Sequence, residues 1–252
     1  MPYGPVRQMQ FVGVDFGWQS GASGLCHLSW DGAQLHLAEL ARLQSMESVL
    51  GWIDQRVGEQ AGAIAVDAPT LIPNQTGMRL PDRLAHKHFG RYHAGCYPAN
   101  LNRPFAEHTV QFGLSLERRG FLHAPTIDPR QPGRYQMEIF PHPATIHLFG
   151  LPQILKYKKG TLAQRFPELM RLRQLCLEHL PKLMPPLKLE AAQLPISEQR
   201  GKPMKALEDK LDSLVCAYVA AHWWYWGTEK NWVLGDRDRG YIIGPAPVYG
   251  SD

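Results

Sequence analysis

Residues 10–17 read QFVGVDFG, an apolar run with β-branched and aromatic residues that ends in an aspartate and a glycine. Such a run predicts a buried strand that delivers one carboxylate, Asp15, to the edge of a sheet. A carboxylate between Val14 and Phe16 is costly to bury unless a metal ion, a basic side chain or backbone N–H groups meet it. An aspartate that only caps the following turn is an equally common explanation of the same pattern.

The same construction returns twice, in AIAVDAP, which carries Asp67, and in YQMEIFPH, which carries Glu138. Between the first two copies, LCHLSW and AQLHLAEL predict two further strands, so that the first three strands form an antiparallel meander. Residues 45–59 show helical spacing of apolar residues and predict a crossover helix. A crossover places the next strand parallel to an earlier one. If that strand is the first, Asp15 and Asp67 lie side by side.

Residues 69–125 are rich in proline, glycine, histidine and arginine and predict an insertion over the carboxyl ends of the strands. Within it, Arg79, Arg83, Lys87 and Arg91 recur every four residues, and a helix over residues 81–89 would gather the middle members on one face. A solvated surface stripe is the more common explanation of such a pattern. Next to an acidic metal site, contact with phosphate groups becomes a competing one.

The last long helix is predicted over residues 204–226, after an amphipathic helix over residues 162–180 and a proline-rich connector over residues 181–203. It is apolar on two sides, which indicates that it is sandwiched. Asp209 and Asp212 lie on one of these sides and are expected to point toward the sheet. Favourable placement near the helix dipole is the alternative, and it explains Asp212 less well. A final edge strand is expected within residues 232–243.

Together, the acids could converge on one pocket, where their repulsion would require hard divalent cations, Mg²⁺ or Mn²⁺. Two such ions generate a hydroxide and stabilise the leaving oxygen of a phosphodiester, so the predicted reaction is hydrolysis of nucleic acid, DNA or RNA. The candidate catalytic residues are Asp15, Asp67, Glu138, Asp209 and Asp212, and all of these except Glu138 are candidate metal ligands. The candidate substrate-binding residues are Arg83, Lys87, Arg91, His142, Lys158 and Lys159.

The bulk properties fit an ordinary globular protein. The 252 residues are 44% hydrophobic and 20% charged, which excludes disordered and fibrous classes, and the net charge of +4 permits an anionic partner without requiring one. Four scattered cysteines form no CxxC pair, and neither a signal peptide nor a membrane span is visible. We therefore expect a cytoplasmic protein of one domain over residues 1–252, with no membrane association; a homodimer is compatible with the sequence.

Several short motifs in a fixed order resemble a known family. They are GVDFG, VDAP, RLPDR, GRYHAGCYPAN, EIFPHPATIHLFG, YKKG and DKLDSL, which span about residues 11–226. The chain resembles the ribonuclease H-like fold and, more closely, the bacterial family called domain of unknown function 429 (DUF429), whose members are described as predicted nucleases. The resemblance implies a mixed α/β sheet flanked by helices and a metal-dependent nuclease in the style of Holliday-junction resolvases. Its acids fall on Asp15, Asp67, Asp209 and Asp212, with Glu138 as a fifth ligand.

Two alternatives stay open. GVDFG and AVDAP also resemble the phosphate loops of actin-like ATPases and sugar kinases, but those proteins normally use two such domains, and this chain offers one set of strands. A binding protein could also keep the scaffold and recognise nucleic acid or a nucleotide without turnover. Many DUF429 members carry a histidine where Phe140 stands here, so no ligand role passes to that position.

Overall fold

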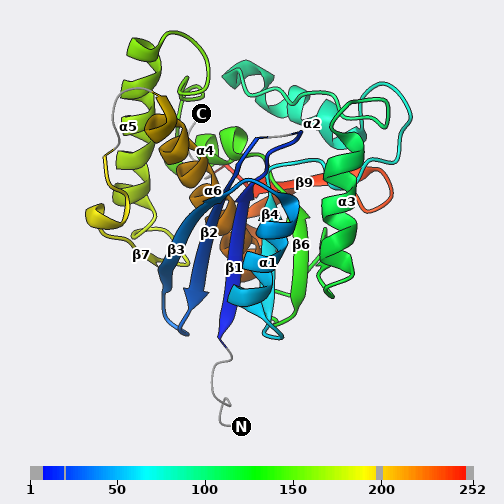
Figure 1. Ribbon diagram of the computed structural model, residues 1–252, viewed down its shortest axis with the longest axis horizontal. Coiled ribbons are helices and arrows are strands. Elements are labelled where there is room, and N and C mark those ends of the chain that lie inside the picture. Colours follow the sequence, from blue (N-terminus) through cyan, green and yellow to red (C-terminus); the bar gives the residue numbers. More distant parts are fainter. Residues whose placement is uncertain (1–7, 20, 197–200, 248–252) are drawn as a thin grey trace.

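A seven-stranded sheet forms the centre of the molecule (Figure 1). The computed structural model describes residues 8–19, 21–196 and 201–247. The strand order in the sheet is β5-β6-β4-β1-β2-β3-β7. Its strands are β1 (Met9–Asp15), β2 (Ser23–Trp30), β3 (Leu35–Leu43), β4 (Gly62–Val66), β5 (Leu122–His123), β6 (Arg134–Glu138) and β7 (Leu187–Lys188).

The strand directions confirm the predicted architecture. β1, β2 and β3 form an antiparallel meander, and β4 runs parallel to β1 with Val14 opposite Val66. β6 is parallel to β4 in turn. A meander of three strands followed by parallel strands in the order β3-β2-β1-β4-β6 is the ribonuclease H-like arrangement. Because β1 and β4 are parallel and in register, Asp15 and Asp67 emerge side by side at the same edge of the sheet, as expected.

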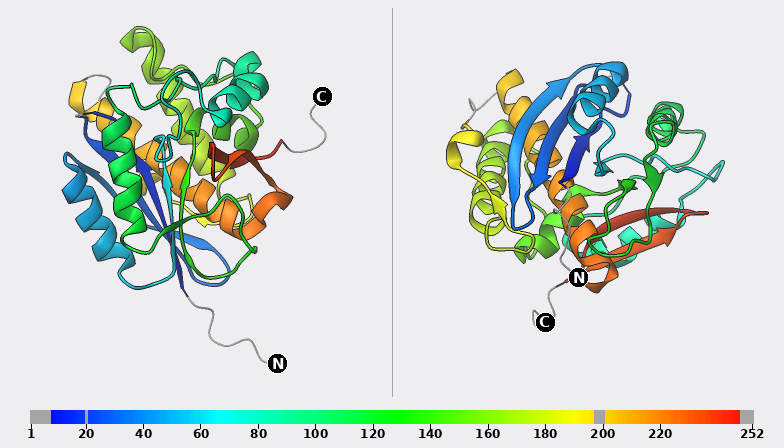
Figure 2. Two further views of the ribbon diagram at one scale, coloured as in Figure 1. Left: turned by 90° about the vertical axis from the view of Figure 1, so that its right-hand side faces the viewer. Right: turned by 90° about the horizontal axis from the view of Figure 1, so that it is seen from below.

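Helices cover both faces of this sheet (Figure 2). They are α1 (Met46–Val57), α2 (Leu80–Phe89), α3 (Ala106–Glu117), α4 (Pro141–Phe149), α5 (Leu162–His179) and α6 (Gly201–Trp226), with the 3-10 helices η1 (Gly90–Tyr92), η2 (Ala191–Gln193) and η3 (Gly227–Glu229). One apolar core lies between the sheet, α1 and α3, and a larger one surrounds α6 and extends to α4 and α5. In the described part of the chain, no helix is long and apolar enough to span a bilayer.

Three segments differ in detail from the sequence predictions. The predicted final edge strand is wrong, because β8 (Asn231–Asp236) and β9 (Gly240–Pro245) pair with each other in a separate two-stranded sheet. An isolated bridge between Ile139 and Ile243 links this hairpin to the residue after β6, and the Tyr241 hydroxyl of β9 donates a hydrogen bond of 2.9 Å to the carbonyl of Gln136 in β6. The connector contains β7 and η2, and α6 begins at Gly201. The segment expected as an insertion carries α2, η1, α3 and β5.

The backbone of α6 lies directly against the sheet at two glycines. A Cβ atom at Gly13 in β1 would come within 1.9 Å of the carbonyl oxygen of Ser213, and one at Gly24 in β2 within 2.0 Å of that of Asp209. No side chain fits in either place, so only glycine permits this approach. The contact brings the amino-terminal half of α6, with its two aspartates, beside Asp15 at the end of β1.

We expect Gly13→Ala to destabilise the protein by ~1–3 kcal/mol or more, since the added methyl group meets helix backbone that can move only by shifting all of α6. Urea unfolding followed by circular dichroism measures this. Gly51→Ala in α1 is the matched control, because a Cβ there has open space around it. This control should stabilise the protein by up to ~1 kcal/mol through helix propensity. Equal stability of the two variants would contradict the close approach.

Candidate active site

Three carboxylates gather where α6 crosses the ends of β1 and β4. Asp15 ends β1 and Asp67 directly follows β4, and the two are half-buried. Both lie on the face of the sheet that α6 covers, because side chains alternate along a strand and Gly13 and Ala65, two positions earlier, contact α6 or its core. Asp212 of α6 is fully buried beneath them. The predicted convergence of these three acids is therefore seen in the structure.

The acidity of this cluster is strongly perturbed. Burial raises the pKa of Asp15 well above its usual value, and repulsion from Asp212 and Asp67 adds to the effect, against the opposing influence of Lys158. Burial likewise raises the pKa of Asp67 to about 7, again with Lys158 opposing and Asp212 adding. Carboxylates held this close without enough positive charge retain protons. Among the described residues, none donates a hydrogen bond to the side-chain oxygens of Asp15 or Asp67.

The loop after α4 supplies the cation of the cluster. The ammonium of Lys158 lies 2.6 Å from Oδ2 of Asp212, and the buried Tyr157 hydroxyl donates a hydrogen bond of 2.6 Å to Oδ1. His142, at the start of α4, stacks on the ring of Tyr157 with the planes 6° apart. Burial lowers the pKa of His142 to about 4, and Lys158 contributes to this, so the imidazole is neutral near pH 7.

The donor set suits a divalent cation in its chemistry. Oδ2 of Asp212 is buried and receives no hydrogen bond of acceptable geometry, although the Lys158 ammonium is close. Such an oxygen, beside two proton-retaining carboxylates, is the environment that Mg²⁺ or Mn²⁺ satisfies. Within residues 8–19, 21–196 and 201–247, no three histidine, cysteine, aspartate or glutamate side chains are grouped so as to hold a metal ion as they stand. At present the positive charge at this point comes from Lys158.

Asp209 lies near the cluster, but both of its carboxylate oxygens already have cationic partners. Its Oδ2 accepts a hydrogen bond of 2.7 Å from Nε of Arg42 in β3, and its Oδ1 pairs with the ammonium of Lys205 at 2.7 Å. Lys205 also pairs with Glu208, one residue earlier. Both oxygens of Asp209 are thus engaged by fixed cations, and the residue is almost inaccessible to solvent.

Glu138 leaves the sheet on the opposite face. It lies opposite Val66 in the β4–β6 register, one residue before Asp67, so side-chain alternation directs it away from α6. Both its oxygens accept hydrogen bonds of 2.7 Å from the guanidinium of Arg79. That guanidinium also donates to the carboxylate of Asp82 and to the carbonyl of Leu71. Glu138 therefore belongs to a buried ion-pair network and not to the three-acid cluster.

The cationic sequence pattern alone does not indicate this role for Arg79. Arg79 is the first member of the four-residue cationic series, but it precedes α2 as its N-cap and is only 3% exposed. The spacing in RLPD could have indicated it, because an aspartate three residues after a helix N-cap often accepts a hydrogen bond from the backbone N–H of the cap residue. The carboxylate of Asp82 accepts such a bond from Arg79 here. The other members, Arg83, Lys87 and Arg91, are exposed on α2 and η1.

A cavity of about 590 Å³ opens onto the acids. Asp15, Asp67 and Glu138 line it, together with His142, Lys158 and Lys159 from the list of predicted site residues. Lys156 and the aromatic side chains of Trp18 and Tyr97 add to its wall, whereas Arg83, Lys87 and Arg91 do not line it. A cavity of this size accommodates a small molecule or a few atoms of a larger one.

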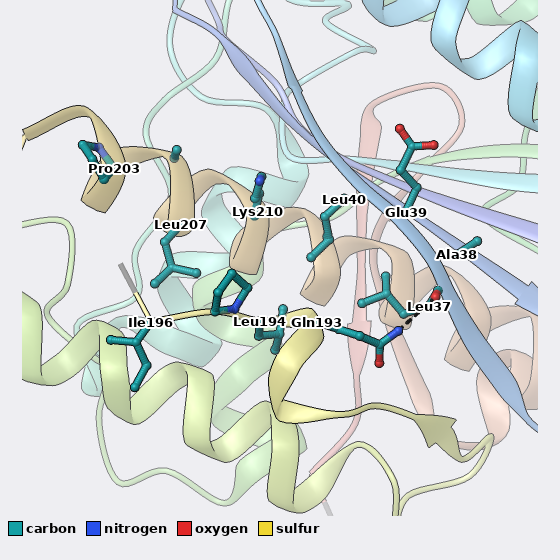
Figure 3. A pocket seen from close by; sticks show the side chains of 12 residues that line it. Leu37, Ala38, Glu39, Leu40, Gln193, Leu194, Ile196, Pro203, Leu207 and Lys210 are labelled. Carbon is teal, nitrogen blue, oxygen red and sulfur yellow. Dashed lines mark hydrogen bonds between the residues drawn. The ribbon is translucent and has the colours of Figure 1, made fainter. Parts of the chain in front are cut away.

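A second cavity of about 430 Å³ lies on the far side of α6, between β3 and the segment after η2 (Figure 3). Its wall is mostly apolar and includes Leu37, Leu40, Leu194 and Leu207. None of the predicted acids lines it, so the cavity above Asp15 and Asp67 is the candidate active site.

Replacing Arg79 with methionine should destabilise the protein by ~3–5 kcal/mol, because Glu138 and Asp82 would be left buried without their cation. Chemical denaturation provides the measurement. Arg83→Met, four residues further along, is the matched control and should change stability by less than ~0.5 kcal/mol, since that side chain is exposed. A small effect at Arg79 would show that the network is not needed for stability.

The raised pKa of Asp67 gives the protein a defined pH dependence in the presence of a chelator. An aspartate loses its proton at about pH 4 in an unfolded chain, whereas Asp67 holds it to about pH 7 in the folded protein. Between these values the folded state binds more protons, so the free energy of unfolding falls as pH rises. We expect Asp67→Asn to gain more than ~1 kcal/mol over the wild type across this range. A difference between the two proteins that does not vary with pH would contradict the raised value.

The chain matches the family model described as "Protein of unknown function (DUF429)" over residues 13–236. Among solved structures, it is similar to one titled "Thermus thermophilus RuvC structure". The two are 13% identical with a TM-score of 0.35, and the match covers 85% of this chain and 97% of that one. No curated protein matches the chain.

Proposed function

Because the chain belongs to the DUF429 family, whose function is unknown, its activity has to be inferred from its own geometry, and we propose that it is a metal-dependent nuclease. The observation that carries the proposal is the meeting of Asp15, Asp67 and Asp212 beneath a cavity lined by lysines. Three carboxylates in this arrangement repel one another when they are ionised, and the one lysine in contact with them does not offset that repulsion. They are explained if they hold a divalent cation.

In this proposal Asp15, Asp67 and Asp212 are the ligands. When bound, Mg²⁺ or Mn²⁺ would lower the pKa of a coordinated water and neutralise charge on a phosphodiester. Asp209 and Glu138 take supporting roles in place of the ligand and catalytic roles expected from the sequence. Asp209 anchors α6 to Arg42 of β3, and Glu138 anchors the end of β6 to Arg79.

The cations of the cavity wall favour a phosphate-bearing substrate. Lys156, Lys158 and Lys159 come from one loop at the cavity, where they can neutralise the backbone of a nucleic acid. The neutral imidazole of His142 lies against the same cavity and can accept a hydrogen bond from the attacking water, which orients it. The exposed Arg83, Lys87 and Arg91 are then more distant contacts for a long substrate.

The structure gives no separate support to a kinase of the actin-like class. That class normally places nucleotide between two domains of this kind, and the described residues contain one sheet with this topology, besides the small β8–β9 hairpin.

Asp15→Asn tests the proposal. The purified wild type should cleave at least one member of a panel of single-stranded, duplex and branched DNA and RNA when Mg²⁺ or Mn²⁺ is added. The variant should lose this activity by more than ~100-fold, since even residues that only support a metal ligand cost ~10–100-fold. It should stay folded, because burial favours the uncharged form of Asp15, and asparagine matches that form in size and charge. Glu59→Gln, on the exposed surface, is the matched control and should keep full activity.

Two results would reject the nuclease. One is a wild type that binds no divalent ion at millimolar concentration in calorimetry. The other is cleavage that persists in Asp15→Asn, which would indicate a contaminating enzyme.

A further inference from the structure

The five predicted acids are neutralised in two different ways. The Arg79 guanidinium holds both oxygens of Glu138, and Asp209 is held by the Arg42 guanidinium at Oδ2 and by the Lys205 ammonium at Oδ1. In the described part of the chain, the only cation in direct contact with the three-acid cluster is the Lys158 ammonium, at Oδ2 of Asp212. A guanidinium fits a carboxylate in a fixed planar geometry, whereas an ammonium is a compact charge on a flexible stem. The Lys158 ammonium can therefore change position more readily than the guanidinium groups of Arg42 and Arg79.

The position of this ammonium is where positive charge is most needed. It lies 2.6 Å from Oδ2 of Asp212, and the Lys158 side chain borders the same cavity that Asp15 and Asp67 line. One ammonium cannot neutralise three ionised carboxylates, so a divalent ion would be the better counter-ion for them.

We propose that Lys158 is an exchangeable internal counter-ion, which occupies the metal position of the empty protein and is displaced by the divalent cation. This inference rests on the proposed function and adds a property that the fold alone does not give. It explains why the carboxylates converge although the described residues form no metal site as they stand.

The loop around Lys158 allows such an exchange without unfolding. Tyr157 is buried, its hydroxyl is held by Asp212, and its carbonyl oxygen accepts a hydrogen bond of 2.8 Å from Arg165. The backbone beside Lys158 is therefore anchored, while the Lys158 side chain is 29% exposed and borders the cavity. Rotation about its own bonds carries the ammonium into the cavity, where it meets the phosphate side of a substrate.

The affinity for Mn²⁺ in the absence of substrate tests the exchange. Calorimetry measures it, and electron paramagnetic resonance of the free ion measures it independently. Lys158→Met removes the competing charge and should bind Mn²⁺ more than ~tenfold tighter than the wild type. Lys159→Met, which removes a neighbouring charge of the same cavity, is the matched control and should change the affinity by less than ~threefold, because exposed charges are screened.

Equal or weaker binding of Mn²⁺ by Lys158→Met overturns the exchange. In that case the proposed nuclease still stands if Asp15→Asn abolishes the binding that the wild type shows. Binding by Lys158→Met but not by the wild type also overturns the exchange, because the ion then fails to displace the ammonium. Absence of binding in all of these proteins overturns both proposals.

A measurement on the wild type covers the case in which Lys158→Met fails to fold. Reductive methylation followed by mass spectrometry reports the reactivity of each lysine amine. An amine that is held in an ion pair reacts more slowly than one that is free. Adding Mg²⁺ should raise the labelling rate of Lys158 by more than ~threefold and leave that of Lys159 unchanged, since an ammonium released from Asp212 into the cavity is accessible to the reagent. An unchanged or slower rate at Lys158 overturns the proposal.

Discussion

The contact between α6 and the first two strands is the constraint on which the site depends. Gly13 and Gly24 allow the helix backbone to rest on the sheet, with carbonyl oxygens of Ser213 and Asp209 in the space that side chains would otherwise fill. A larger residue at either position would lift the helix by the thickness of a side chain. Asp212 would then no longer reach the ends of β1 and β4. The acidic cluster is therefore a result of backbone packing: the lack of side chains at Gly13 and Gly24 determines the position of Asp212.

The charges around this contact are arranged at two levels. The outer acids, Asp209 and Glu138, are each joined to an arginine and hold α6 and β6 in place. The inner acids, Asp15, Asp67 and Asp212, share one lysine, and burial raises the pKa of Asp15 and Asp67. The ion pairs of Asp209 and Glu138 with arginine fix α6 and β6. They thereby hold Asp15, Asp67 and Asp212 close together despite the repulsion among these three carboxylates. This division separates the residues that build the site from those that could carry out chemistry.

Much of the fold could be predicted because it is encoded locally. Apolar strands that end in acids, a tight reversal and a crossover helix lead to the meander, to the parallel β4 and to the adjacency of Asp15 and Asp67. Asp212 could be predicted because α6 is apolar on two sides. The remainder depends on tertiary contacts that spacing does not show. Glu138 ends a strand of the same pattern, yet it lies opposite Val66 and not opposite Asp67, so its side chain is directed to the other face. Arg79 and Lys158 find their partners 59 and 54 residues away, respectively.

The Arg79 guanidinium also has a consequence for how a molecule enters the cavity. It joins the carbonyl of Leu71, the start of α2 at Asp82 and the end of β6 at Glu138, and all three contacts are buried or nearly so. Arg79, Asp82 and Glu138 line the cavity, and the segments that they join cannot separate without exposing a buried charge. This part of the cavity wall is therefore rigid, and an incoming molecule has to adapt to its shape.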